Sequence, residues 1–304
     1  MAVLIPCYNE AVAIPRVVAA FRAALPDATV YVYDNNSTDA TMQAAHEAGA
    51  VVRSERLQGK GHVVRRMFAD IEADVYVLVD GDDTYEAAAA PTLVHLVLDQ
   101  QLDMVTAVRV TDRAAAYRPG HRLGNRVLTG LVATIFGNRV TDMLSGYRAF
   151  SRRFVKSFPA LSTGFETETE LTVHALELDM PVGEVKTEYK ERPPGSTSKL
   201  RTYTDGARIL ALIVRLVKEE RPLQFFSLAG AGFLAGSAIL LLPVLMTWFE
   251  TGLVPRLPSF VAAMVLMLLG FLSFACGLIL ESLARARKEA KRLRYLALPA
   301  PGGR

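Results

Sequence analysis

Short apolar runs alternate with segments of helical periodicity over the first 80 residues. The runs have the length and the content of branched and aromatic side chains that strands favour, and they lie at 3–5, 29–33, 51–52 and 75–79. The segments between them place apolar residues at helical spacing, and they cover 14–25, 38–48 and the residues from 61 onward. Strands and helices in alternation predict an α/β fold with a largely parallel sheet.

Polar clusters follow three of these runs directly. They are Tyr8-Asn9-Glu10, Asp34-Asn35-Asn36-Ser37 and Asp80-Gly81-Asp82-Asp83. Because ligands of parallel α/β sheets bind beyond the carboxyl ends of the strands, we expect one crevice to collect all three clusters.

The pair Asp80 and Asp82 is the strongest local signal. Two carboxylates one residue apart can converge on one hard divalent cation and leave most of its coordination for substrate oxygens, as Mg²⁺ or Mn²⁺ on a diphosphate requires. Gly81 allows a tight turn between them. A solvated acidic turn is the alternative, whereas the rest of an EF-hand calcium loop is missing from the sequence.

Two long uncharged runs lie toward the carboxyl end. Residues 225–249 and 260–280 contain no Asp, Glu, Lys or Arg over 25 and 21 residues, which is long enough to cross a bilayer. The short segment between them predicts a transmembrane hairpin, with two buried helices of a soluble core as the alternative. Gly232 and Gly236 form a GxxxG pair, which favours close packing within the hairpin or between protomers of a homo-oligomer.

Basic residues flank the hairpin unevenly. The connecting loop carries only Arg256, whereas the outer flanks carry Lys218, Arg221, Arg285, Arg287, Lys288, Lys291, Arg292 and Arg294. The excess of cations predicts that both outer flanks, and with them both termini, lie in the cytoplasm. The first residues lack the basic start of a signal peptide. Residues 204–222 predict an amphipathic helix, either in the membrane interface or packed on a core.

The composition agrees with a membrane-anchored globular protein. Hydrophobic residues make up 51% of the chain and charged residues 21%, which excludes intrinsic disorder. The net charge of +3 is too near balance to favour binding to nucleic acid. Cys7 and Cys276 lie far apart, so neither a disulfide framework nor a cysteine-based zinc site is expected, and the five histidines form no i, i+4 metal pair.

Six short motifs follow one another in the chain. They are Pro-Cys-Tyr-Asn-Glu at 6–10, Asp-Asn-Asn-Ser-Thr-Asp-Ala-Thr at 34–41, Gly-Lys-Gly at 59–61, Asp-Gly-Asp-Asp at 80–83, Ser-Gly-Tyr-Arg at 145–148 and Gly-Ser-Thr-Ser-Lys-Leu at 195–200. Together they resemble the family 2 glycosyltransferases of GT-A fold, over about residues 1–220. Within that family the chain is most similar to the polyprenyl-phosphate branch, whose acceptors are dolichol phosphate or undecaprenyl phosphate.

The resemblance implies an inverting sugar transfer on a Rossmann-like domain that binds a nucleotide sugar. It implies that Pro6, Tyr8, Glu10 and Asp34 hold the base and ribose of the donor. It also implies that Lys60 lies beside the nucleotide and that Asp80 and Asp82 bind Mg²⁺ or Mn²⁺ under the diphosphate. Many dolichol-phosphate mannose synthases have a DxDxQ-like run, and Thr84 replaces that Gln here, so the resemblance does not specify mannose.

The acceptor side has its own requirements. A phosphate monoester is already mostly dianionic at neutral pH, so holding two anions together matters more than a general base. Cations must line such a site; the candidates are Arg148, Arg192 and Lys199, with the hydroxyls of Ser196 and Ser198 beside them.

Two acidic positions are candidates for the acceptor side. The resemblance implies an essential carboxylate at Asp142, which could orient Arg148, bind the acceptor or act as the base; a turn residue is the alternative. Glu168 is a weaker candidate base. A helix would place its neighbours Glu166 and Glu170 on one face, whereas a strand would align all three glutamates.

These observations predict a GT-A catalytic domain over 1–203, an interfacial helix over 204–222, a transmembrane hairpin over 223–281 and a basic cytoplasmic tail over 282–304. The expected protein is an integral enzyme of the plasma membrane, or of a bacterial inner membrane. It moves a sugar from a nucleotide-diphosphate donor to a polyprenyl phosphate. The alternatives are transfer to another lipid or to a growing polysaccharide, although the QxxRW element of processive synthases is absent, and a non-catalytic membrane scaffold of the same fold.

Overall fold

The computed structural model describes residues 1–110, 130, 140–164, 166–190, 214–215 and 217–302. The chain divides into two compact units, one of Met1–Ile209 with Ala290–Arg304 and the other of Leu210–Glu289. The predicted phosphate-binding residues Arg192, Ser196, Ser198 and Lys199 lie outside the described residues, as does most of the predicted helix over 204–222.

The first unit is built on a mixed sheet, whose seven described strands have the order β3-β2-β1-β4-β6-β5-β7. The strands are β1 (Ala2–Cys7), β2 (Thr29–Asp34), β3 (Val51–Ser54), β4 (Val75–Leu78), β5 (Met104–Val110), β6 (Arg148–Ser151) and β7 (Val182–Glu188). β1 is parallel to β2 and β4, whereas β6 is antiparallel to both of its neighbours. The ends of β1, β2 and β4 therefore point to one edge, as the alternating pattern predicts.

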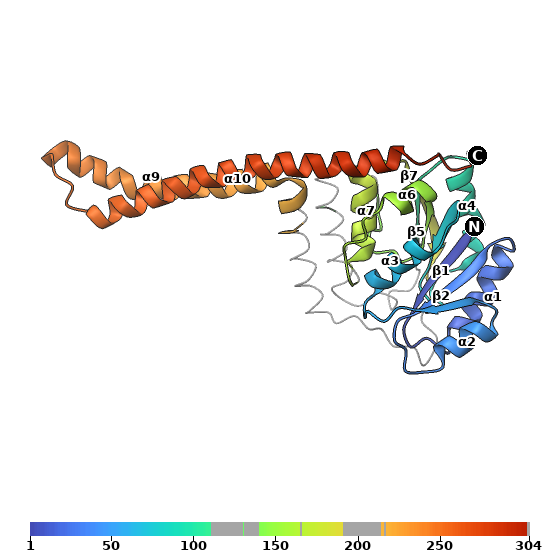
Figure 1. The fold of residues 1–304 in the computed structure, drawn as a ribbon. Helices are drawn as coiled ribbons and strands as arrows, with labels where there is room; N and C mark the ends of the chain where they lie inside the picture. The colour runs from blue at the N-terminus through green and yellow to red at the C-terminus, as the bar shows by residue number, and fades with distance from the viewer. Residues whose placement is uncertain (111–129, 131–139, 165, 191–213, 216, 303–304) are drawn as a thin grey trace. The chain divides into compact units, whose positions relative to one another are not determined.

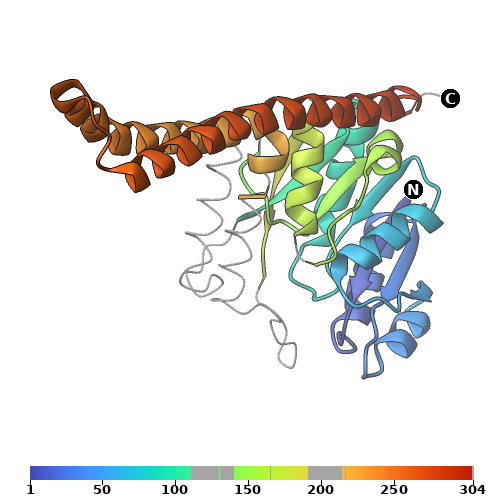
Figure 2. The same cartoon turned by 60° about the vertical axis from the view of Figure 1, so that its left-hand side comes forward.

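Helices cover both faces of this sheet (Figure 1, Figure 2). One face carries α1 (Ile14–Ala24), α2 (Thr41–Glu47), η1 (Ala87–Ala89) and α4 (Ala90–Leu98). The other carries α3 (Lys60–Asp70), α6 (Arg152–Ser157) and α7 (Thr167–Glu177). The three layers enclose a core on each side of the sheet.

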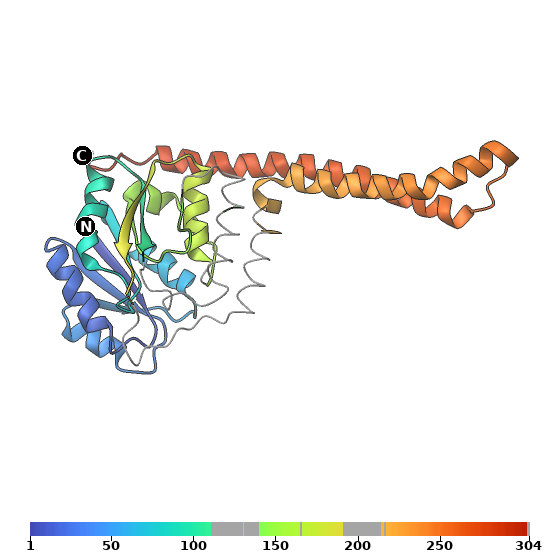
Figure 3. The ribbon, with the colours of Figure 1, turned by 180° about the vertical axis from the view of Figure 1, so that it is seen from behind.

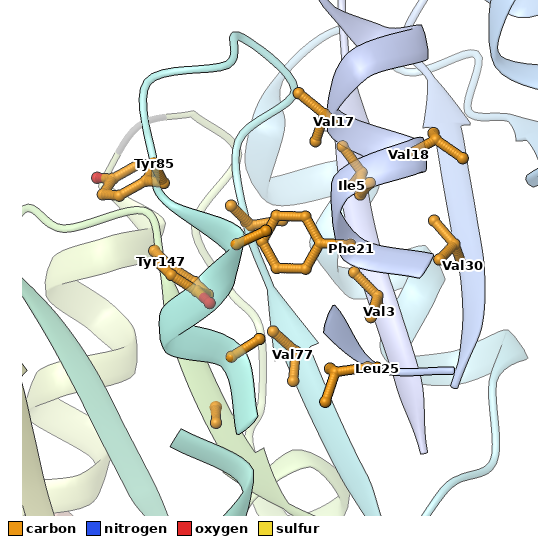
Figure 4. Close-up of a cluster of buried hydrophobic side chains, with 14 of the residues drawn as sticks. Val3, Ile5, Val17, Val18, Phe21, Leu25, Val30, Val77, Tyr85 and Tyr147 are labelled. Atoms are coloured by element: carbon orange, nitrogen blue, oxygen red, sulfur yellow. The ribbon is translucent and has the colours of Figure 1, made fainter. Parts of the chain in front are cut away.

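The alternation of side chains along β1 explains the first of these cores. Val3 and Ile5 point toward α1 and pack near Phe21 (Figure 4). The ring of Phe21 meets Tyr147 edge to face, with the centroids 5.7 Å apart, and both rings are buried. This contact packs α1 against the segment just before β6, at the side of the sheet where β4 ends.

The element boundaries depart from the prediction where side chains compete for the backbone. The helix expected over 38–48 begins at Thr41. Before that point the Thr38 amide donates to Asn9 Oδ1, and the Thr41 amide donates to Asp39 Oδ1. Such local bonds favour turns over helix. Glu168 and Glu170 lie in the first turn of α7, which confirms the helical alternative for the glutamate run.

The second unit consists largely of two apolar helices that run side by side (Figure 3). They are α9 (Pro222–Thr251), with a mean hydropathy of 2.1 in its most apolar window, and α10 (Leu257–Leu296), with 2.5. Both are long and apolar enough to cross a membrane. α10 continues through the basic residues as far as Leu296, so much of the segment that we predicted as a tail is helical.

A close approach between α9 and α10 occurs at Gly230 and Gly270. A methyl group on Gly230 would lie 3.0 Å from the carbonyl oxygen of Gly270, and Ser237 donates to a backbone carbonyl of α10. In contrast, a methyl on Gly232 would meet nothing within 4 Å, and one on Gly236 would make only an ordinary contact. Within the hairpin, tight packing therefore involves Gly230 rather than the predicted GxxxG pair.

The last turns of α10 belong to the first unit. Lys291 forms a 2.6 Å ion pair with Glu177 at the end of α7, and the Tyr295 hydroxyl donates to Asp103 at 2.7 Å. The guanidinium of Arg153 lies 4.8 Å from the centre of the Tyr295 ring. Since Asp103 and Glu177 are both buried, the end of α10 completes the fold of this unit.

Candidate active site

The loops after β1 and β2 are held together by their polar residues. The Asn9 amide donates to the Ser37 hydroxyl at 2.8 Å, and the Glu10 amide donates to the Thr41 hydroxyl at 2.9 Å. Asp34 is 3% exposed; its Oδ2 accepts the Ser37 amide, while Oδ1 has no hydrogen-bond partner among the described residues. A buried carboxylate oxygen of this kind fits an N–H or O–H donor of a ligand.

The four predicted base- and ribose-binding residues lie along this edge. Pro6 and Tyr8 are half-buried and Glu10 is buried. Cys7, between Pro6 and Tyr8, pairs with Asp34 in the parallel register of β1 and β2. The structure thus brings these residues to the ends of two neighbouring strands.

Asn35 joins this edge to the start of α3. Its amide nitrogen donates to the carbonyls of Glu55 and Leu57, and its Oδ1 accepts the Gly59 amide at 2.7 Å. Asn35 belongs to the motif at 34–41, which predicted no role for this residue. Its contacts fix the loop that precedes Lys60.

The glycines on either side of Lys60 let another segment approach. A Cβ on Gly59 would lie 2.1 Å from the Thr163 carbonyl oxygen, and one on Gly61 would lie 2.2 Å from that of Ser162. Gly59 also has a φ of 131°, which side chains rarely permit. The close approach brings the segment that leads into α7 next to Lys60.

Lys60 lies between two carboxylates. Its Nζ is 2.5 Å from Asp80 Oδ1 and also contacts Glu168 Oε1. Burial alone would lower the pKa of Lys60, but the two carboxylates outweigh burial and raise it. Lys60 therefore stays a cation at neutral pH, beside the acidic loop after β4.

The loop after β4 is tightly fitted around its two aspartates. A Cβ on Gly81 would lie 2.5 Å from the Cys7 sulfur, and one on Gly146 would lie 2.2 Å from Asp80 Oδ2. Asp82 is buried, and its Oδ1 accepts hydrogen bonds from the Thr84 hydroxyl at 2.6 Å and the Thr84 amide at 3.3 Å. In the described part of the chain, no group of three or more His, Cys, Asp or Glu residues is arranged to hold a metal.

Asp142 pairs with a cation that the sequence analysis missed. Its two carboxylate oxygens accept hydrogen bonds from Nε and Nη2 of Arg109, each at 2.7 Å. Burial would raise the pKa of Asp142, but the hydrogen bonds and charge of Arg109 lower it. The Arg109 guanidinium lies 5.6 Å from the centre of the Tyr189 ring. The hydrogen bonds of Asp142 therefore orient Arg109, whereas the guanidinium of Arg148 has other partners.

Arg148 does not fit the phosphate-binding role that we predicted. It is fully buried, and its guanidinium donates to the carbonyls of Met143 and Ser145 and to the Thr172 hydroxyl. Burial lowers its pKa to about 10, against the opposing charges of Glu168 and Asp142. An acceptor phosphate needs an accessible guanidinium, whereas Arg148 holds the backbone of the loop that carries Asp142.

Glu170 and Glu168, both in the first turn of α7, make different contacts. Glu170 accepts the amides of Leu161 and Ser162, each at 2.8 Å, and so closes the turn before the helix. Glu168 is buried against Lys60, and its Oε2 has no hydrogen-bond partner among the described residues. Because its Oε1 already pairs with Lys60, this geometry favours an electrostatic role for Glu168.

Comparison with known proteins places the chain among glycosyltransferases. The family model described as "Glycosyl transferase family 2" matches residues 2–158. The chain is 34% identical to glycosyltransferase AglJ of Haloferax volcanii over 97% of both chains. It is 30% identical to a dolichyl-phosphate hexose transferase of the same organism, over 73% of this chain and 95% of that one.

Solved structures support the fold alone. The crystal structure of glucosyl-3-phosphoglycerate synthase from Mycobacterium tuberculosis in complex with Mn²⁺, uridine diphosphate and phosphoglyceric acid aligns with a TM-score of 0.59. It is 23% identical, over 71% of this chain and 77% of that one. Its GT-A, Rossmann-like mixed sheet corresponds to the sheet described above.

Proposed function

We propose a specific reaction for this chain, which belongs to glycosyl transferase family 2. It transfers a sugar, with inversion, from a nucleotide-diphosphate donor to a polyprenyl phosphate at the cytoplasmic face of a membrane. The observation that carries this proposal is the pair Asp80 and Asp82 at the end of β4, beside the Lys60 ammonium and on the same sheet edge as Asp34.

The donor side fits a nucleotide joined to a metal-bound diphosphate. Pro6, Tyr8, Glu10 and Asp34 would hold the base and ribose, and the buried Asp34 Oδ1 offers them an acceptor. Asp80 and Asp82 would hold Mg²⁺ or Mn²⁺, because carboxylate oxygens are the ligands that these hard ions prefer. The bound ion supplies neutralisation of the departing diphosphate. Lys60 adds a positive charge on the same side.

The acceptor side needs cations more than a base. Two like unit charges about 4 Å apart repel by about 4 kcal/mol at an effective dielectric of 20. Positive side chains must therefore compensate the negative charge of an acceptor phosphate that lies near the diphosphate. Arg192 and Lys199, with Ser196 and Ser198, remain the proposed phosphate ligands. Asp142 would act by orienting Arg109, whose side chain is 15% exposed.

The membrane helices and a named relative support a lipid acceptor. A polyprenyl chain lies in the bilayer, so an enzyme with two membrane-spanning helices meets the phosphate where it emerges. A relative 30% identical to this chain is named a dolichyl-phosphate hexose transferase. The excess of cations outside the hairpin supports a cytoplasmic position for both termini. A reporter fused after Arg304 tests that topology, and activity of an extracytoplasmic reporter contradicts it.

A donor panel tests the reaction. Full-length protein in detergent is incubated with Mn²⁺, undecaprenyl phosphate or dolichyl phosphate, and radiolabelled nucleotide sugars, and the lipids are separated by chromatography. We expect one labelled lipid product that disappears with chelator and with Asp82→Asn. Label in another lipid or in a polymer would support the alternative acceptors. No product with any donor, together with normal function of Asp82→Asn in cells, would support a scaffold.

A further inference from the structure

One ammonium group is shared by two carboxylates that differ in accessibility. Lys60 contacts both Asp80 and Glu168. The Asp80 side chain is 31% exposed, whereas that of Glu168 is 8% exposed. A ligand from solvent can therefore reach Asp80 far more easily than Glu168.

We propose that Glu168 is a positioning residue that holds Lys60 so that Asp80 can bind a divalent cation. The inference rests on the proposed function, because it concerns one of the two proposed metal-binding carboxylates. It assigns Glu168 neither the abstraction of a proton nor a contact with the metal. Its effect passes through the ammonium group of Lys60.

The physical reason is competition for one carboxylate. A divalent cation on Asp80 would bind the same carboxylate that Lys60 contacts, and its positive charge would repel the Lys60 ammonium. A nearly buried ammonium must keep a counter-charge, since a lone buried charge is strongly unfavourable. If Asp80 were its only carboxylate, Lys60 would oppose the metal. Glu168 provides a second, less accessible partner, and this lowers the cost of displacing Lys60 from Asp80.

Glu168 also has a second carboxylate oxygen that can accept a hydrogen bond from Lys60. Its Oε1 contacts the ammonium, while Oε2 is buried and lacks a hydrogen-bond partner among the described residues. A carboxylate can accept hydrogen bonds on both oxygens. An N–H that leaves Asp80 can therefore be accepted by Glu168, and the ammonium stays hydrogen-bonded while the metal binds.

The local fold fixes Glu168 at this place. Glu168 lies in the first turn of α7, where the helix dipole favours a negative charge. The glycine at position 61 allows the start of α7 to approach α3, because a Cβ there would lie 2.8 Å from the Thr167 hydroxyl. The buried Arg148 guanidinium also interacts with the charge of Glu168. These features hold the carboxylate close to Lys60.

A double-mutant cycle in metal affinity tests the proposal. Binding of Mn²⁺ alone, without nucleotide, is titrated by electron paramagnetic resonance for the full-length wild type, Glu168→Gln, Lys60→Met and the double variant. We expect Glu168→Gln to weaken Mn²⁺ binding by about tenfold, because Lys60 then depends on Asp80. We expect Lys60→Met to bind Mn²⁺ as tightly as wild type or more tightly. In the Lys60→Met background, Glu168→Gln should change the affinity by less than about twofold.

An equal loss in both backgrounds would overturn the proposal, because Glu168 would then act on the metal directly through its charge. Absence of Mn²⁺ binding in the wild type would instead contradict the metal site of the proposed function, and this inference with it. Thermal unfolding without metal checks that each variant is folded. If Glu168→Gln does not fold, Glu168→Asp, which keeps the charge but shortens the reach, replaces it in the cycle with the same expected dependence on Lys60.

Discussion

The hydroxyl of Thr84 donates a 2.6 Å hydrogen bond to Oδ1 of Asp82. The carbonyl of Thr84 also accepts the backbone amide of Lys190 at 2.8 Å, and Thr84 is 1% exposed. One buried residue thus joins a proposed metal-binding carboxylate to the chain that follows β7. The position where the related mannose synthases have Gln is here occupied by a residue that orients a neighbouring carboxylate.

Removing this hydroxyl should weaken metal binding. Thr84→Val keeps the shape of the side chain but removes a hydrogen bond to a charged group, a type of bond worth about 1.5–3 kcal/mol. We expect the Mn²⁺ affinity to fall by about tenfold, because Asp82 loses its fixed orientation. Thr84→Ser keeps the hydroxyl and should bind Mn²⁺ nearly as the wild type does. Equal Mn²⁺ titrations for the Val and Ser variants would contradict this role.

The ion pair of Asp142 with Arg109 should make stability depend on acidic pH. The pKa of Asp142 is lower in the folded chain than its usual value, so its contribution is full above the unfolded pKa of about 3.9. That contribution is lost as the pH falls through the folded pKa. Asp142→Asn should therefore be destabilised at pH 7, by about 3 kcal/mol since Arg109 loses its partner, and should lose less further stability in acid.

Thermal unfolding between pH 7 and pH 3 measures this effect. The matched control is Asp83→Asn, whose 3.2 Å pair with Arg16 is much more exposed and should contribute little. An Asp142→Asn curve parallel to that of the wild type throughout this range would show that the pair does not contribute in this way.

Arg148 should be required for folding rather than for acceptor affinity. Arg148→Met leaves two backbone carbonyls and the Thr172 hydroxyl without their donor in a buried place. We expect a loss of about 3 kcal/mol or more in the free energy of unfolding. Arg148→Lys should be destabilised as well, because one ammonium cannot reproduce the directions of a planar guanidinium. A stable Arg148→Met protein with a raised KM only for the lipid phosphate would restore the predicted phosphate-binding role.

Local patterns predicted the strands and the edge of the sheet, but they did not predict contacts between distant segments. Alternating apolar runs located β1, β2 and β4, and the strand ends then brought Asp34 and Asp80 to one edge. The pairing of Arg109 with Asp142 spans 33 positions and has no local pattern.

Charge alone misled the prediction for Arg148. A guanidinium suits bidentate contacts with phosphate, which suggested a ligand, yet the residue lies in β6, where each of the four side chains is buried. A strand buried on both faces must satisfy a charged side chain internally. The end of α10, which we predicted as a basic cytoplasmic tail, likewise brings Lys291 to a buried carboxylate.

A single methyl group at Gly61 should destabilise the chain even though it favours helix. Gly61 lies in α3, and replacing a helical Gly by Ala ordinarily gains up to about 1 kcal/mol. Here the new Cβ would lie 2.2 Å from the Ser162 carbonyl oxygen, a backbone atom that can move only with its segment. Gly61→Ala should therefore lower the unfolding temperature and separate Glu168 from Lys60. Gly232→Ala adds the same group in α9 where nothing lies within 4 Å, so it should be neutral or stabilising. Thermal unfolding of both variants decides the matter, and a Gly61→Ala protein more stable than the wild type would show that the two segments do not pack this closely.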